Sequence, residues 1–253
     1  MDLALWQYAL LSFAGVIAGW LNVMAGGGSM LTVPIMVFMG MPGPVANGTN
    51  RIAILAQNIS AVATFFQQGF RDLKLGFSLA AASVPGAIAG AMVGVQLEGE
   101  WFDRVLALIM IGMMILMMTG QEGKKSTAHV QHRPSRRQLI LGHICMVGAG
   151  FWGGFIQIGV GFILMPILHR VMGFDLVRVN FFKVFVVLIY TIVALMIFAA
   201  NTEVFWIAGL ALALGNAIGG FLGARTSISK GENLIRWVLN IVLVAFIIKL
   251  LFF

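Results

Sequence analysis

Acidic residues are scarce in this chain, which has nine aspartates and glutamates among 253 residues, against sixteen lysines and arginines. Charged side chains make up only 10% of the chain, whereas a soluble domain has about 25%. The acidic residues lie beside the first residue or in and near the segments that connect apolar runs. The sequence therefore offers no group of carboxylates inside an apolar segment that would bind a metal cation.

Cysteine and histidine are scarce as well. Cys145 is the only thiol, which excludes an internal disulfide, and it has no neighbouring base that would activate it. His129 and His132 lie in a basic connector without a partner cysteine or acid. The chain also lacks the glycine-rich loop that binds ATP phosphates. These absences argue against a metal site, a thiol enzyme and direct use of ATP.

Long apolar runs, in contrast, fill most of the chain. Hydrophobic residues make up 60% of it, and the mean hydropathy is +0.98. Several runs reach the roughly 20 residues that a helix needs to cross a bilayer, and they are continuous rather than alternating, which favours helices over strands. The sequence thus predicts an all-α membrane protein. Eight runs are apparent, and the second arms of the two hairpins described below bring the number to about ten transmembrane helices. The runs are Trp6–Met24, Val45–Phe66, Leu75–Leu97, Val105–Met118, Leu139–Ile156, Val184–Ala200, Val204–Leu222 and Trp237–Phe253.

The net charge of +7 is distributed as a topology signal rather than as a nucleic-acid-binding patch. Short connectors rich in lysine and arginine face the cytoplasm. The connectors expected on the opposite side contain mainly Glu98, Glu100, Asp103 and Glu203. Most of the basic residues fall in or beside four connectors, at Arg71 and Lys74; at Lys124, Lys125, Arg133, Arg136 and Arg137; at Arg170 and Arg178; and at Arg225, Lys230 and Arg236.

This charge pattern requires the stretch Leu139–Leu168 to leave the cytoplasmic side and return, so it is expected to form a helical hairpin around the glycines of "GGFIQIGVGFILMP". By analogy Leu3–Gly40 forms a hairpin with its turn at "AGGGS". The sequence is compatible both with hairpins that span the membrane and with hairpins that are re-entrant. Three further crossings follow each hairpin.

Each half then contains five helical elements, and an odd number inverts the second half relative to the first. Pro34 and Pro166, Arg51 and Lys183, and Gly27 and Gly159 all differ by the same offset. The sequence predicts two inverted repeats, 1–120 and 138–253, joined by a basic cytoplasmic linker at 121–137, with both termini periplasmic. Inverted repeats are typical of secondary transporters, whose sites lie where helices are broken.

Two cations inside apolar helices are the leading candidates for a binding site. Ionisable residues within a membrane are costly and are functional candidates by default. Arg51 and Lys183 occupy matching positions in the two halves, and no carboxylate lies nearby on either helix. They are expected to bind an anion together in one cavity. Alternatively, each caps backbone carbonyls at a hairpin turn or extends to the interface.

The two glycine turns supply the second part of this candidate site. Helices that restart at Ser29 and Gly161 present free N–H groups and a positive dipole end, which suits an anion. Close helix packing is the alternative for the turns, and it is the favoured interpretation for two further glycine series with spacing of four, Gly86–Gly90–Gly94 and Gly215–Gly219–Gly223. The predicted substrate-binding residues are Arg51, Lys183, Asn22, Gly26, Gly27, Gly28, Ser29, Asn47, Asn50, Gln57, Gln157, Gly159 and Gly161.

The segments "AGWLNVMAGGGSMLTVP" and "GMPGPVANGTNRIAI" resemble the first signature of the sulfite exporter TauE/SafE family, also called toluene sulfonate uptake permeases. "GGFIQIGVGFILMPIL" and "RVNFFKV" resemble its second signature. Gln157 and Val160 stand where the family pattern has glycines, and Phe181 and Phe182 where it has small or hydroxyl residues. The resemblance covers essentially the whole chain and implies transport of sulfite, sulfonates or related sulfur-containing anions.

Together these observations predict a permease in a bacterial inner membrane, with no enzymatic activity, no cofactor and no nucleic-acid partner. Its substrate is a small sulfur-containing anion, and transport is either coupled to a proton or sodium ion or facilitative. The alternatives are transport of another small organic anion, such as a carboxylate, and a membrane-embedded sulfur-relay protein.

Overall fold

The computed structural model describes residues 3–97 and 134–252, together with positions 99, 101, 102, 104, 105, 108 and 112 between them. The run Val105–Met118 and the predicted linker 121–137 lie almost entirely outside the described residues. The regular structure of the described part is helical, which confirms the predicted all-α class. Its elements are α1 (Leu5–Met24), α2 (Ser29–Phe38), α3 (Gly43–Gln67), α4 (Leu73–Gly94), α6 (Arg136–Phe155), α7 (Val160–Pro166), the π-helical turn η1 (Ile167–Val171), α8 (Leu176–Asn201) and α9 (Trp206–Phe252).

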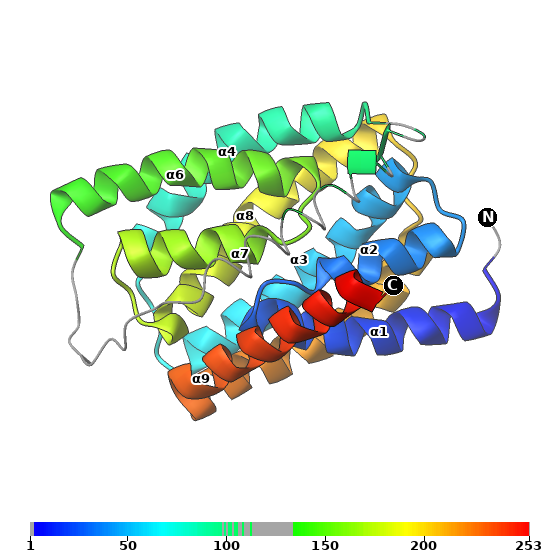
Figure 1. The fold of residues 1–253 in the computed structure, drawn as a ribbon. Helices are drawn as coiled ribbons and strands as arrows, with labels where there is room; N and C mark the ends of the chain where they lie inside the picture. Colours follow the sequence, from blue (N-terminus) through cyan, green and yellow to red (C-terminus); the bar gives the residue numbers. More distant parts are fainter. Residues whose placement is uncertain are drawn as a thin grey trace.

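Five described helices are long and apolar enough to cross a membrane: α1, α4, α6, α8 and the segment Trp206–Gly231 of α9. Each has 20 to 26 residues, or roughly 30–39 Å of helix. At the end of this segment, Gly231 has a φ of 65° and breaks α9. The chain reverses direction near this break (Figure 1).

Helix α3 is distinctive because it is long but polar. Its 25 residues include Asn47, Thr49, Asn50, Arg51 and Gln57, and all of these side chains are buried. A helix with a polar face in a membrane bundle must turn that face inward, since lipid cannot form hydrogen bonds with it. Helix α3 therefore brings most of the polar candidates to the interior.

The two predicted hairpins are present, and the helices break at the expected places. Helices α1 and α2 are separated by residues 25–28, and α6 and α7 by residues 156–159. Helix α2 has 10 residues, or roughly 15 Å, which is too short to cross about 30 Å of hydrocarbon. The hairpins enter the bundle from opposite ends and turn near its middle (Figure 1). This arrangement is compatible with the predicted inverted repeat.

The helices pack in a matching pattern around these hairpins. Helix α1 lies along α9 on one side of the bundle, and α6 lies along α4 on the other, with α3 and α8 between the two pairs (Figure 1). Each outer pair thus joins the long arm of one hairpin to a helix of the other predicted repeat.

The glycine series hold these outer pairs together, as their spacing predicted. A Cβ atom at Gly90 of α4 would overlap the carbonyl oxygen of Phe151 on α6, and one at Gly219 of α9 would overlap that of Val16 on α1. Without side chains at these positions the backbones approach closely, which strengthens helix packing where no hydrophobic effect drives it. The same close approach occurs at Gly86, Gly94, Gly150, Gly154, Gly15, Gly19, Gly215 and Gly223.

We predict that Gly90→Ala destabilises the protein by about 1–3 kcal/mol, because its methyl group requires α4 and α6 to separate. Gly148→Ala is the matched control, since Gly148 lies on the exposed face of α6 with no atom within 4 Å of an added Cβ. This control is expected to be neutral or slightly stabilising. Thermal unfolding in detergent measures both. Equal unfolding temperatures for the two variants would show that the α4–α6 contact is not close.

Candidate substrate-binding site

The tips of the two hairpins meet at a pair of glycines. A Cβ atom placed at Gly26 would overlap the Cα atom of Gly161, and one placed at Gly161 would overlap the Cα atom of Gly26. Gly26 also has a φ of 85°, a conformation that residues with side chains rarely adopt. The glycines at this point therefore allow two backbones from opposite ends of the bundle to touch.

The other turn residues have different roles. Gly28 packs against the carbonyl oxygen of Ala18 on α1, and Gly27 faces the ring of Phe162. Gly159 adopts the left-handed conformation directly before α7. Gln157 also has a positive φ, of 61°, although it is not a glycine. Glycine adopts this conformation more readily than glutamine does.

Arg51 is fully buried and binds the end of α6. Its Nη1 atom donates hydrogen bonds to the carbonyl of Gly153 at 3.0 Å and to Oε1 of Gln157 at 3.2 Å, and its Nη2 atom donates to the carbonyl of Gly154. The guanidinium also lies 4.3 Å from the centre of the Phe198 ring. Arg51 thus caps the C-terminal carbonyls of α6, where the helix dipole is negative.

Lys183 forms the corresponding cap on α1. Its Nζ atom donates to the carbonyl of Val23, in the last turn of α1, at 2.6 Å and to Oδ1 of Asn180 at 2.9 Å. Lys183 is 2% exposed, and no buried carboxylate occurs among the described side chains. Each central cation therefore caps the broken helix of the other predicted repeat, as the capping alternative anticipated. Capping leaves open whether either cation also binds an anion.

A small cavity lies beside the meeting point of the tips. Its volume is about that needed to hold one water molecule. Lys183 lines it and Arg51 does not, so this cavity is not the shared site of both cations that the sequence predicted. Arg51 reaches the cavity only through Gln157. The lining residues are Asn22, Ser29, Gln57, Asn58, Gln157, Val160, Gly161, Lys183, Val184 and Val187.

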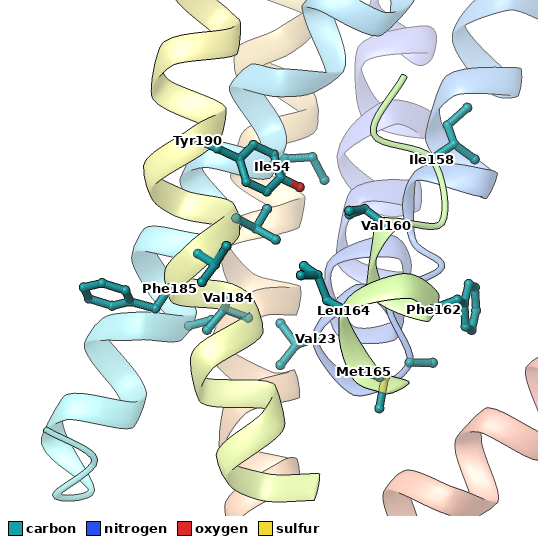
Figure 2. Packing of buried hydrophobic residues seen from close by; sticks show 14 of the residues in the cluster. Val23, Ile54, Ile158, Val160, Phe162, Leu164, Met165, Val184, Phe185 and Tyr190 are labelled. Atoms are coloured by element: carbon teal, nitrogen blue, oxygen red, sulfur yellow. The ribbon is translucent and has the colours of Figure 1, made fainter. Parts of the chain in front are cut away.

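The apolar wall of this region comes from several helices. Figure 2 shows Val23 of α1, Leu164 of α7 and Val184 of α8 around the region where these helices approach one another. Figure 2 also labels Tyr190 of α8 and Ile54 of α3, which belong to the same buried hydrophobic cluster. The cavity lining itself combines four amide side chains, Ser29 and the Lys183 ammonium with Val160, Val184 and Val187.

The predicted substrate-binding residues divide into those that line the cavity and those that do not. Asn22, Ser29, Gln57, Gln157, Gly161 and Lys183 line the cavity, whereas Asn47, Asn50 and the remaining glycines do not. Asn50 joins α3 to α2, because its amide donates to Ser29 and accepts from Thr32. Asn47 donates to the carbonyl of Phe155 at the end of α6.

Two polar residues in or next to the cavity were not in the predicted set. Asn58 lines the cavity, and Asn180 holds the Lys183 ammonium. The sequence did contain a signal for both: Asn58 adjoins Gln57, and Asn180 lies one turn before Lys183 on the same helix. Phe181 and Phe182, in contrast, pack against Phe65, Phe70 and Phe174 rather than facing the cavity.

The sequence profile of the family described as sulfite exporter TauE/SafE matches residues 11–250. This chain belongs to that family. A probable membrane transporter protein, ORF9, from Sinorhizobium sp is 28% identical over 99% of this chain and 94% of the relative. Probable membrane transporter protein YfcA from Escherichia coli K12 is 26% identical over 96% of this chain and 89% of the relative. No solved structure matches the chain. The chain is therefore a membrane transporter of the TauE/SafE family.

We predict that Arg51→Met destabilises this TauE/SafE protein by about 2–4 kcal/mol, because it leaves the acceptors at Gly153, Gly154 and Gln157 buried without a donor. Arg71→Met is the matched control, since Arg71 lies exposed in the α3–α4 connector. Thermal unfolding in detergent compares the two variants. An Arg51→Met protein as stable as the control would contradict the capping role.

Proposed function

We propose that this transporter moves sulfite, organosulfonates or related sulfur-containing anions, and that it binds them between the hairpin tips at Lys183. The observation that supports this proposal is the ammonium of Lys183, which lines the cavity, whereas none of the buried side chains in the described part of the chain is a carboxylate that could neutralise it. A buried positive charge of this kind favours an anionic ligand. The family description, sulfite exporter, supports the sulfur-containing class.

The backbone at the start of helix α2 supplies further hydrogen-bond donors for such an anion. No hydrogen bond to another described residue is found for the backbone N–H groups of Gly27, Gly28 and Ser29, and Ser29 lines the cavity. A helix N-terminus of this kind stabilises oxyanions through its free amides and its dipole. The amide side chains of Asn22, Gln57 and Gln157 add neutral donors that orient an oxygen-rich group.

The narrow cavity corresponds to a closed state in this proposal. A sulfonate is larger than one water molecule, so the hairpins must separate before it binds. Alternating access then moves one outer helix pair with its hairpin relative to the other, which opens the cavity to each end of the bundle in turn. The proposed location is a bacterial inner membrane, with both termini periplasmic.

A small carboxylate is the alternative substrate, because it presents the same charge to Lys183. A sulfur-relay enzyme has less support, since Cys145 does not line the cavity. Competition between acetate and methanesulfonate on the purified protein separates the two anion classes. Stronger binding of acetate would favour the carboxylate.

We predict that Lys183→Met weakens the binding of methanesulfonate at least about tenfold, or about 1.4 kcal/mol, because it removes the charge within the cavity. Neutral dimethyl sulfone has a similar shape and is expected to bind weakly to both proteins. Lys74→Met serves as the matched control, since Lys74 is an exposed lysine at the start of α4. Titration calorimetry at fixed salt measures the affinities. Absence of methanesulfonate and sulfite binding by the unmodified protein would refute the proposed function.

A further inference from the structure

The hydrogen-bond count of Lys183 is incomplete when the side chain is charged. An ammonium group has three N–H donors, and two acceptors are present, the carbonyl of Val23 at 2.6 Å and Oδ1 of Asn180 at 2.9 Å. No third acceptor is found among the described residues. A neutral amine has two N–H donors and one lone pair, so it satisfies both acceptors with no donor remaining.

The corresponding cation of the other predicted repeat has a different chemistry. Arg51 donates to three acceptors through its Nη atoms, and its buried Nε has no partner among the described residues. Its guanidinium nevertheless remains protonated in proteins, so an unsatisfied donor does not lead to loss of its proton. Lysine is the cation that exchanges its proton when it is buried away from carboxylates. One central cap therefore keeps a fixed charge, and the other is able to switch between two protonation states.

We propose that the coupling ion is a proton and that Lys183 binds it together with the transported anion. The proposal rests on the proposed function, because it assigns the coupling ion of the same site. The amine form satisfies Val23 and Asn180 and repels an anion through its lone pair. The ammonium form presents its third N–H to the cavity and attracts one. Proton and anion therefore increase each other's affinity by the same factor.

The proton balance of one transport step is simple. On one side of the membrane the Lys183 amine takes a proton from water and forms its third N–H bond, and an anion binds to that N–H. After the hairpins expose the cavity to the other side, the anion leaves, and the ammonium returns the proton to water. One proton and one anion move together, so a monovalent anion crosses with no net charge.

Among the described residues that line the cavity, Lys183 is the one titratable side chain. Among the described buried residues, the titratable side chains are Arg51 on α3, Tyr190 on α8 and Lys183 itself. Asn22 of α1, Ser29 of α2, and Gln57 and Asn58 of α3 face the cavity with uncharged groups, as does Gln157 before α7. The described carboxylates Asp72, Asp175 and Glu203 lie near helix ends and are not buried.

The test is proton uptake on anion binding by the full-length protein in weakly buffered detergent solution. Methanesulfonate is the probe, because a sulfonate does not titrate in the accessible pH range. From mildly acidic to alkaline pH, uptake by the unmodified protein is expected to rise toward one proton per bound anion. Affinity is expected to fall by up to about tenfold per pH unit at the alkaline end.

Lys183→Arg distinguishes proton coupling from anion binding. It keeps the positive charge but fixes the proton, so it is expected to bind methanesulfonate without proton uptake and with little pH dependence. Lys74→Arg, at an exposed lysine, is expected to behave as the unmodified protein does. If Lys183→Arg does not fold, the pH dependence of proton uptake and of methanesulfonate affinity in the unmodified protein tests the inference by itself.

Three outcomes would overturn the inference. These are methanesulfonate binding by the unmodified protein without proton uptake at any pH, uptake by Lys183→Arg equal to that of the unmodified protein, and a sodium requirement for binding at every pH. Each of these leaves anion transport itself intact. Failure of the unmodified protein to bind any sulfur-containing anion refutes the proposed function instead, so the two failures are distinguishable.

Discussion

Helices that end inside a membrane bundle leave backbone carbonyls where no water can reach them, and the rest of this structure depends on satisfying those carbonyls. Helices α1 and α6 both end in this way near the middle of the bundle. Lys183 caps the end of α1 and Arg51 caps the end of α6, each from the central helix of the other predicted repeat. The hairpins, the buried cations and the polar interior of α3 thus follow from one constraint.

The same constraint links stability to function. A broken helix gives up several internal hydrogen bonds, but it also creates donors and acceptors in the interior that a continuous helix lacks. At the contact of Gly26 and Gly161, these groups come from both ends of the bundle. Gln157 connects the two regions, because it lines the cavity, accepts from Arg51 and donates to Thr191. A ligand that displaces Gln157 would therefore also affect the cap on α6.

Much of the fold could be predicted from the sequence, because apolar length, connector charge and glycine spacing act locally. The breaks near Gly27 and Gly159 and the packing of Gly90 and Gly219 are examples. The roles of the two cations could not be separated in this way. Arg51 and Lys183 match in sequence position, yet only Lys183 lines the cavity. That difference depends on how side chains from α1, α2, α3, α7 and α8 fill the centre, which no local pattern encodes.

The most direct test of this account is the position of a heavy-atom sulfonate in a crystal of the protein. Bromine in 2-bromoethanesulfonate scatters anomalously, so its site is located independently of the surrounding density. The account predicts a bromine peak between the hairpin tips, with the sulfonate oxygens within hydrogen-bond distance of Lys183 Nζ and the start of α2. A sulfonate bound at the Arg51 cap without contact to Lys183, or only at the basic connectors, would contradict it.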